Sequence, residues 1–126
     1  MRSQIVLVVD DNAIIADTLA IILNQFGFHA TAVHSGEEAV QIAENLRPGY
    51  LISDVQMHGM NGVETALQIC EKLPGCRVLL FSGDPGAEEM VVGPRTNGPD
   101  FEFLNKPFHP ASLLSRMSST MHLWAE

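Results

Sequence analysis

Hydrophobic residues are arranged along this chain in two alternating patterns. Short, nearly continuous apolar runs bounded by turn residues are typical of strands buried in a parallel sheet. Such runs occupy residues 5–9, 29–33, 51–54, 77–81 and 101–105. Between them, apolar residues recur at intervals of three and four, which is the spacing of one face of an α-helix. The sequence therefore predicts strands alternating with helices.

Start and stop signals bound the predicted helices. Gly27 follows the first helix, and Ser35 with Glu38 three residues later matches a capping box that opens the second. Pro-Gly pairs end the second and third helices, and Pro110 opens the last. The residues expected to face the core are Ile15, Leu19, Ile22 and Phe26 in the first helix, Ala39, Val40, Ala43 and Leu46 in the second, Val63, Ala66, Leu67, Cys70 and Leu73 in the third, and Leu113, Leu114, Met117 and Met121 in the last.

One segment departs from this alternation. Residues 83–99 contain four glycines and three prolines, which penalise helix interiors, so we expect a short or irregular fourth helix there. The whole pattern predicts a single α/β domain, residues 1–126, with a parallel sheet covered by helices on both faces. The pattern alone does not give the order of the strands.

Composition and charge narrow the classes of function. The 126 residues, 46% of them apolar, suffice for one globular domain with a substantial core. No apolar run reaches the ~20 residues of a membrane span and no signal peptide is evident, so we expect a cytoplasmic protein without membrane contact. A formal net charge of −8 disfavours sequence-independent nucleic-acid binding, and we expect no direct DNA binding. Cys70 and Cys76 lack CxxC spacing and are expected to be buried or idle thiols.

Polar residues follow four of the predicted strands. They are Asp10 and Asp11, Asp54, Ser82, and Lys106. The carboxyl ends of parallel strands share one edge of a sheet, so these side chains should gather there. Three clustered carboxylates repel one another, and Mg²⁺ relieves that repulsion while leaving positions for phosphate oxygens. The set predicts a magnesium-dependent phosphoryl-group site with Asp54 as the nucleophile, because aspartate can form an acyl phosphate and lysine can pair with a phosphoryl oxygen.

From end to end the chain resembles the receiver domains of response regulators, the CheY-like family. The matching residues are Asp10-Asp11, then Asp54 with Met57, Asn61 and Gly62, then Ser82-Gly83, and finally Lys106-Pro107-Phe108. The resemblance implies a flavodoxin-like sheet of order 2-1-3-4-5. It also implies a role in two-component signal transduction, in which a histidine kinase or phosphotransfer protein phosphorylates Asp54 and the domain switches its protein interactions. Such a domain is not an enzyme beyond catalysing its own phosphorylation and dephosphorylation.

The resemblance also assigns roles to particular residues. Ser82 and Lys106 would contact the phosphoryl group, Ser82 and Phe103 would form the switch, and the Lys106–Pro107 peptide would be cis. The domain would be a monomer or a weak dimer. The expected protein ligands of Mg²⁺ are Asp10 through a water, Asp11, Asp54 and the backbone carbonyl of Gln56.

Three features depart from the family pattern. His58 stands where relatives usually have proline, and we expect an exposed loop histidine there. Phe103 has no hydroxyl, so any switch at this position would be steric. Residues 83–99 replace a regular helix that relatives commonly use for signalling and dimerisation, which puts output through that face in doubt.

Other functions on a similar fold remain as alternatives. A flavodoxin-type cofactor binder would need a phosphate loop after the first strand, where Asp10-Asp11 instead repels phosphate. A haloacid-dehalogenase-type phosphatase would usually have a second acid at the position of Gln56. A pseudo-receiver that acts as an interaction module without phosphorylation is disfavoured by the intact set of acids.

Overall fold

The computed structural model describes residues 4–84, 86 and 101–125. Strands and helices alternate from residue 5 to residue 82, and a fifth strand and a last helix follow within residues 101–125. The strand bounds agree with the predicted ones to within one residue. The expected irregular fourth helix falls in a segment that lies largely outside the described residues. The elements are β1 (Ile5–Val9), α1 (Ala13–Gln25), β2 (His29–Val33), α2 (Gly36–Leu46), β3 (Tyr50–Asp54), α3 (Gly62–Lys72), β4 (Arg77–Ser82), β5 (Phe101–Asn105) and α5 (Pro110–Ala125).

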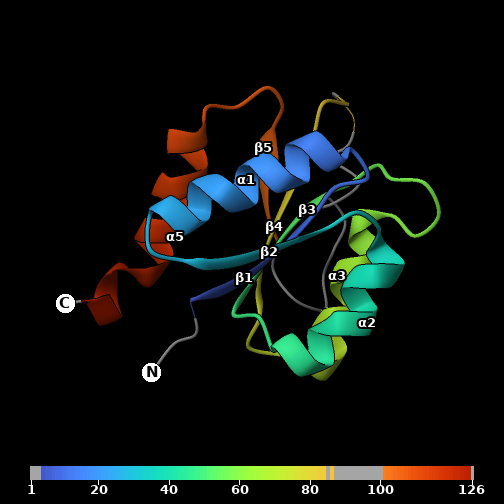
Figure 1. Ribbon diagram of the computed structural model, residues 1–126, viewed down its shortest axis with the longest axis horizontal. Coiled ribbons are helices and arrows are strands. Elements are labelled where there is room, and N and C mark those ends of the chain that lie inside the picture. Colours follow the sequence, from blue (N-terminus) through green and yellow to red (C-terminus); the bar gives the residue numbers. More distant parts are fainter. Residues whose placement is uncertain (1–3, 85, 87–100, 126) are drawn as a thin grey trace.

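The strands of the described residues form one parallel sheet in the order β2-β1-β3-β4-β5 (Figure 1). This is the order that the family resemblance implied, and the predicted fold class is confirmed. Val9 of β1 pairs with Ser53 of β3, and Asp54 pairs with Phe81 of β4. The carboxyl ends of these three central strands therefore lie level at one edge of the sheet.

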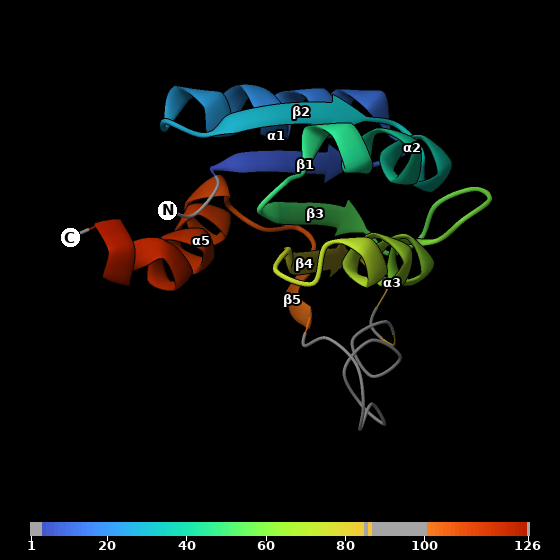
Figure 2. The ribbon, with the colours of Figure 1, turned by 90° about the horizontal axis from the view of Figure 1, so that it is seen from below.

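Helices cover both faces of the sheet, with α1 and α5 on one face and α2 and α3 on the other (Figures 1 and 2). Alternate residues of each strand point to opposite faces, so each strand contributes to two separate hydrophobic clusters. Along β3, for example, Ile52 packs with α1 and α5, whereas Leu51 packs with α2 and α3. Cys70 and Cys76 are both buried and are not joined in a disulfide, as expected. Burial, reinforced by neighbouring Cys70, raises the pKa of the Cys76 thiol to about 12.

The buried face of α1 differs from the predicted one. Phe26, expected to face the core, is the C-cap residue and is 63% exposed, whereas Leu23 is fully buried. The buried side chains of this helix are Ala16, Leu19, Ala20 and Leu23. Apolar residues lie on several sides of α1, so their spacing does not select one face. The packing of the helix against the sheet selects the face that carries Ala16, Leu19, Ala20 and Leu23.

The other helices follow the prediction more closely. The hydroxyl of Ser35 accepts the N–H of Glu38 at 3.1 Å, so half of the expected capping box is confirmed, but the Glu38 carboxylate accepts the N–H of His34 at 3.2 Å. In α3, Leu67 is 45% exposed and was wrongly placed in the core, which Ile69 enters instead. In α5, Leu113 and Met117 are fully buried and Leu114 is partly buried against the same core, whereas the side chain of Met121 lies outside the described residues. None of the helices in the described part of the chain is long and apolar enough to span a membrane.

Candidate functional site

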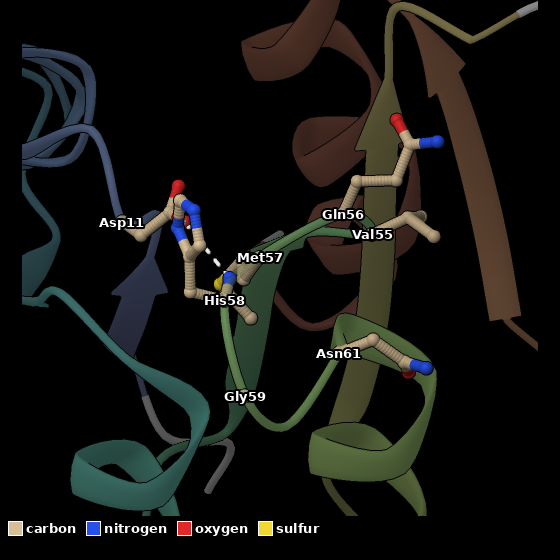
Figure 3. A pocket seen from close by; sticks show the side chains of 7 residues that line it. All are labelled: Asp11, Val55, Gln56, Met57, His58, Gly59 and Asn61. Atoms are coloured by element: carbon tan, nitrogen blue, oxygen red, sulfur yellow. Dashed lines mark hydrogen bonds and ion pairs between the residues drawn. The ribbon is translucent and has the colours of Figure 1, made fainter.

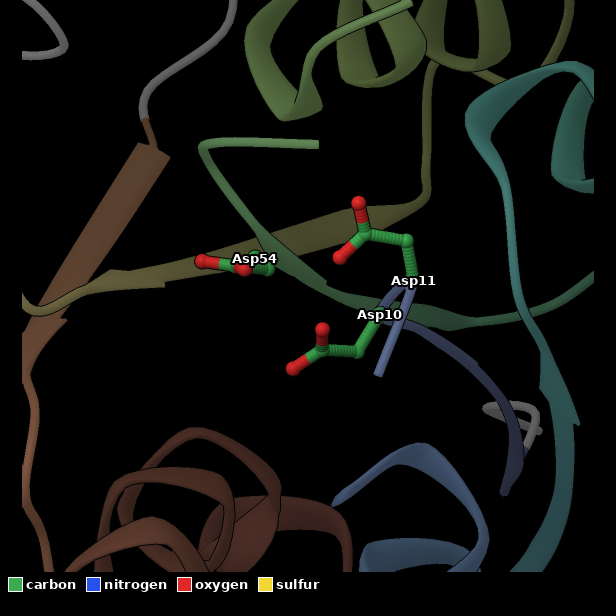
Figure 4. A group of neighbouring side chains, drawn as sticks. All are labelled: Asp10, Asp11 and Asp54. Carbon is green, nitrogen blue, oxygen red and sulfur yellow. The ribbon is translucent and has the colours of Figure 1, made fainter. Parts of the chain in front are cut away.

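Three aspartates meet at the carboxyl edge of the sheet. Asp10 and Asp11 directly follow β1 and Asp54 is the last residue of β3, and their carboxylate oxygens lie within 4.8 Å of one another (Figure 4). Asp10 and Asp54 are 1% and 7% exposed, whereas Asp11 is exposed. The structure thus brings together the three acids that the sequence placed at one sheet edge.

The backbone around Asp54 is fixed by close packing with α3. The carbonyl of Val55 accepts the N–H of Gly62, the first residue of α3, at 2.8 Å. A Cβ atom at Gly62 would overlap the carbonyl oxygen of Asp54, so only glycine permits this approach. The hydroxyl of Ser53 donates to the same Asp54 carbonyl at 2.9 Å. Asp54 therefore lies on a rigid strand end.

Lys106 provides the positive charge of the site. Its ammonium nitrogen lies 3.5 Å from Oδ2 of Asp10 and 3.6 Å from Oδ2 of Asp54. The same nitrogen is 4.9 Å from the ring centroid of buried Phe81, and this cation–π contact orients the lysine. Phe108 packs edge-on against Phe81, with the ring centroids 5.6 Å apart. The Lys106–Pro107 peptide is cis, as the resemblance implied.

The environment of Asp54 raises the pKa of its carboxyl to about 6. Burial is the largest cause and repulsion from Asp10 is the second. Attraction to Lys106 and the N–H of Gln56 act in the opposite direction without cancelling them. Near neutral pH the ionised form of Asp54 thus carries an electrostatic cost, which a further cation at this edge would relieve.

Asp11 is held by the loop between β3 and α3, residues 55–61. Oδ2 of Asp11 accepts the backbone N–H of His58 at 3.0 Å and lies 2.8 Å from Nδ1 of its ring (Figure 3). The His58 N–H, followed by the ring, lowers the pKa of Asp11. The His58 side chain is otherwise fully exposed, as the sequence led us to expect, but its bond to Asp11 was not anticipated.

Ser82 is engaged in a network that the sequence did not indicate. Its hydroxyl is buried, donates to Oε1 of Gln56 at 3.0 Å and accepts the N–H of Asp84 at 3.0 Å. Nε2 of Gln56 donates to Oδ2 of Asp84 at 2.7 Å. The Gln56 side chain accordingly points away from Asp11, towards β4 (Figure 3). The N–H of Gly86, followed by Gln56, lowers the pKa of Asp84.

Phe103, the expected partner of Ser82 in the switch, is only 7% exposed and belongs to the core between the sheet and helices α2 and α3. Ser82 and Phe103 lie on neighbouring strands, where Leu80 pairs with Phe103 and Ser82 with Asn105. Phe103 is therefore displaced by two positions from Ser82 on the neighbouring strand, and the role of the two residues as a switch stays a prediction.

The donor set of the site suits Mg²⁺. Three carboxylates within 4.8 Å offer the hard oxygen ligands that this ion prefers. Oδ2 of Asp10 is buried and accepts no hydrogen bond from the described residues, although Lys106 lies 3.5 Å away. A buried acceptor without a donor is costly, and a bound cation or its water would satisfy it. Beside the acids, Asp11 and residues of the β3–α3 loop line an open depression of about 480 Å³ (Figure 3).

The response regulator receiver domain family matches residues 6–118. The chain belongs to this family. It is therefore a signalling domain of two-component response regulators, and receiver domains bind Mg²⁺ at an acidic pocket of this kind.

Similar proteins agree with this assignment. The DNA-binding response regulator MtrA of Mycolicibacterium paratuberculosis is 29% identical over 96% of the chain, and the chain spans 52% of that protein. A response regulator receiver protein from Sinorhizobium medicae has a TM-score of 0.81 at 25% identity, with 95% of each chain covered. The signal receiver domain of a histidine kinase from Syntrophus aciditrophicus has a TM-score of 0.75 at 30% identity, covering 91% of this chain and 87% of that one.

These relatives correct one expectation. The expectation of no direct DNA binding is wrong, because it conflicts with relatives named as DNA-binding response regulators. It rested on the net charge of −8, and net charge describes the average field of a domain rather than what a response regulator binds. The chain spans about half the length of these relatives, so acidity in this half carries no information about the rest of such a protein.

Proposed function

We propose that this receiver domain accepts a phosphoryl group on Asp54 from the phosphohistidine of a histidine kinase or phosphotransfer protein, and thereby switches its interactions with other proteins. The observation that carries this proposal is the position of the Asp54 carboxylate, 3.6 Å from the Lys106 ammonium and beside the Asp10-Asp11 pair. A nucleophile, a positive charge for phosphoryl oxygens and a set of hard metal ligands thus share one sheet edge.

The transfer requires little more than positioning and charge stabilisation. A carboxylate oxygen of Asp54 forms a bond to phosphorus as the phosphorus–nitrogen bond of phosphohistidine breaks, and the departing imidazole takes up a proton from water. Lys106, already oriented over Phe81, shifts from the Asp54 carboxylate to a phosphoryl oxygen and stabilises its charge. Rigid packing around Gly62 keeps the nucleophile in place during this exchange.

Asp10, Asp11, Asp54 and the backbone carbonyl of Gln56 would hold Mg²⁺, which when bound supplies positive charge for the phosphoryl oxygens. Burial and the neighbouring Asp10 disfavour ionised Asp54, so the protein alone keeps part of its nucleophile protonated near neutral pH. Lys106 offsets only part of that repulsion. Burial and Asp10 therefore create the need for a cation, and the three acids provide its ligands.

Ser82 transmits the change. Its hydroxyl is held by Gln56 and Asp84, so contact with a phosphoryl oxygen requires the bond to Gln56 to break. Release of Gln56 also removes one hydrogen bond from Asp84, at the start of the segment that follows β4. We infer that this rearrangement, with Phe103 next to it in the core, alters the surface presented to partner proteins.

Phosphorylation is tested by incubation with acetyl phosphate and Mg²⁺, followed by intact mass measurement. We expect one magnesium-dependent phosphoryl adduct, absent in Asp54→Asn and retained in the control Asp17→Asn, which alters an exposed carboxylate on α1. An adduct that persists in Asp54→Asn would overturn the assignment of the nucleophile. The absence of any adduct on the unaltered chain would instead favour the pseudo-receiver.

The metal ligands are tested separately by calorimetric titration with Mg²⁺. Asp11→Asn removes a charged ligand and should weaken binding by roughly tenfold or more, whereas Ser82→Ala removes no proposed ligand and should change it little. Equal affinities of the two variants would contradict the metal assignment.

A second candidate function concerns the target of the output. The names of the relatives favour control of DNA binding as the output of a protein that contains this domain. The test is fluorescence anisotropy with labelled duplex DNA, before and after treatment with acetyl phosphate. A change in the affinity for DNA on phosphorylation would support DNA as the target. Identical DNA-binding curves before and after phosphorylation, measured at low salt, would speak against it.

A further inference from the structure

The β3–α3 loop is attached to the first turn of α2 through Glu37. Oε2 of Glu37 accepts the backbone N–H of Met60 at 3.0 Å. The preceding residue, Gly59, has a φ of +73°, and a Cβ atom there would lie 2.7 Å from the same carboxylate oxygen. The carboxylate therefore lies directly against the loop backbone, at a position where glycine leaves room for it.

The surrounding contacts show that this attachment is part of a close fit. Gly36, the first residue of α2, is buried, and a Cβ atom there would overlap the hydroxyl of Thr65 and lie 3.1 Å from the carbonyl of Met60. Thr65 is itself fully buried and donates to the carbonyl of Asn61 at 2.8 Å. The start of α2, the loop and the start of α3 are thus packed against one another.

The loop has another attachment at its opposite side, where His58 bonds to Oδ2 of Asp11. Asp11 belongs to the acid cluster, so a cation bound to this oxygen would compete with His58 for it. The bond between Glu37 and Met60 involves no member of the acid cluster. It is consequently able to hold the loop whether or not the acids bind a cation.

We propose that Glu37 is a positioning residue of the phosphorylation site, which fixes the β3–α3 loop so that the Gln56 carbonyl is in place to bind Mg²⁺. The link to phosphorylation rests on the proposed function. The physical basis is that a loop ordered in advance does not have to be ordered when the metal binds, so the apparent affinity is higher.

Glu37 also lies in the first turn of α2, where any acidic residue stabilises the helix through its dipole. Glu38 provides the matched control for this effect. It carries the same charge in the same helical turn, but its carboxylate accepts the N–H of His34 rather than a bond from the β3–α3 loop. A purely helical role would make the two residues equivalent.

Three substitutions at Glu37 distinguish the length of its side chain, which brings the carboxylate to the loop, from its charge. Glu37→Ala removes both, Glu37→Asp keeps the charge but shortens the side chain, and Glu37→Gln keeps the length and one acceptor oxygen but removes the charge. Glu37 is exposed, so none of these changes disturbs the core. Glu38→Ala completes the set.

The first measurement is amide hydrogen exchange of Met60 by NMR in metal-free protein. We expect exchange about tenfold faster in Glu37→Ala and Glu37→Asp, and within about threefold of the unaltered chain in Glu37→Gln and Glu38→Ala. The second is calorimetric titration with Mg²⁺, in which the affinity should fall by up to the same factor in the first two variants only.

Unchanged Met60 exchange in Glu37→Ala would overturn the proposal. So would faster exchange without any loss of Mg²⁺ affinity, which would make the contact merely structural. The proposal would also be overturned if Met60 exchange and Mg²⁺ affinity depended on charge alone. In that case Glu37→Asp would behave like the unaltered chain and Glu37→Gln like Glu37→Ala. None of these measurements requires phosphorylation, so a failure of the proposed function shows separately, as an unaltered chain that forms no phosphoryl adduct.

Discussion

The hydroxyl of Ser82 donates a hydrogen bond to Oε1 of Gln56 at 3.0 Å, which joins the last residue of β4 to the loop that follows β3. Before phosphorylation, the hydroxyl proton of Ser82 is thus already engaged in a hydrogen bond to Gln56. If this hydroxyl is to donate to a phosphoryl oxygen instead, its bond to Gln56 has to break. Movement of Gln56 also breaks the bond between Gln56 and Asp84. The two bonds favour the unphosphorylated arrangement.

Gln56→Ala is therefore expected to favour the phosphorylated arrangement. Loss of one net hydrogen bond shifts such an equilibrium by roughly three- to tenfold. Affinity for beryllofluoride, a mimic of the acyl phosphate, should rise by that factor in a calorimetric titration at fixed Mg²⁺. Gln41→Ala, on the exposed face of α2, is the control and should bind as the unaltered chain does. Weaker binding in Gln56→Ala would contradict this account of Ser82.

Lys106→Met should impair phosphorylation and raise the pKa of Asp54 above about 6, because the ammonium 3.6 Å away no longer stabilises the carboxylate. Removal of a single charge-stabilising group typically slows such a reaction by roughly 10²-fold. The rate is measured with acetyl phosphate, and the pKa by carbon NMR of the Asp54 carboxyl. Lys72→Met, which breaks only an exposed pair with Glu44, should change neither quantity. An unchanged or lower Asp54 pKa in Lys106→Met would refute the electrostatic role of Lys106.

The raised pKa of Asp54 predicts that, without divalent cations, the folded protein loses stability as pH rises. The carboxyl binds its proton more tightly in the folded state, at a pKa of about 6, than in the unfolded chain, at 3.8. The contribution of Asp54 to the free energy of unfolding is about 2 to 3 kcal/mol. It is fully present below about pH 4 and is lost as pH rises through about 6. Urea unfolding between pH 4 and 7 should show this decline, and Mg²⁺ should reverse it. Asp54→Asn should lack this component, and a variant that declines as steeply as the unaltered chain would exclude Asp54 as its source.

Gly62→Ala should destabilise the fold by about 2 kcal/mol or more, because the added methyl group overlaps the Asp54 carbonyl and the backbone has to shift. Gly75→Ala is the matched control, since a Cβ atom there meets nothing within 4 Å, and it should change stability by less than about 0.5 kcal/mol. Thermal unfolding measures both. Equal melting temperatures of the two variants would show that the backbone near Asp54 tolerates displacement.

Much of the fold was accessible from the sequence because its signals are local. A buried parallel strand is apolar along its whole length and ends at a turn residue, so the strands could be placed to within one residue. The same logic placed Asp54 and the Asp10-Asp11 pair at one edge, since parallel strands align their carboxyl ends. The strand order came from resemblance, because apolar runs do not record which neighbour each strand pairs with.

Only the tertiary structure decided which side chains of the site bind one another. Gln56 and Asp84 are 28 residues apart in the chain, and Glu37 and Met60 are 23 apart. A polar residue at the surface has the same sequence signature whether it faces water or a distant partner, so neither pair could be predicted. The inner face of α1 was also decided by packing, because Leu23 is buried against the sheet with Ala16 and Ala20, whereas Phe26 is exposed. Sequence alone thus determined the chemistry gathered at the sheet edge, whereas the three-dimensional arrangement of distant segments determined which groups hold that chemistry in place.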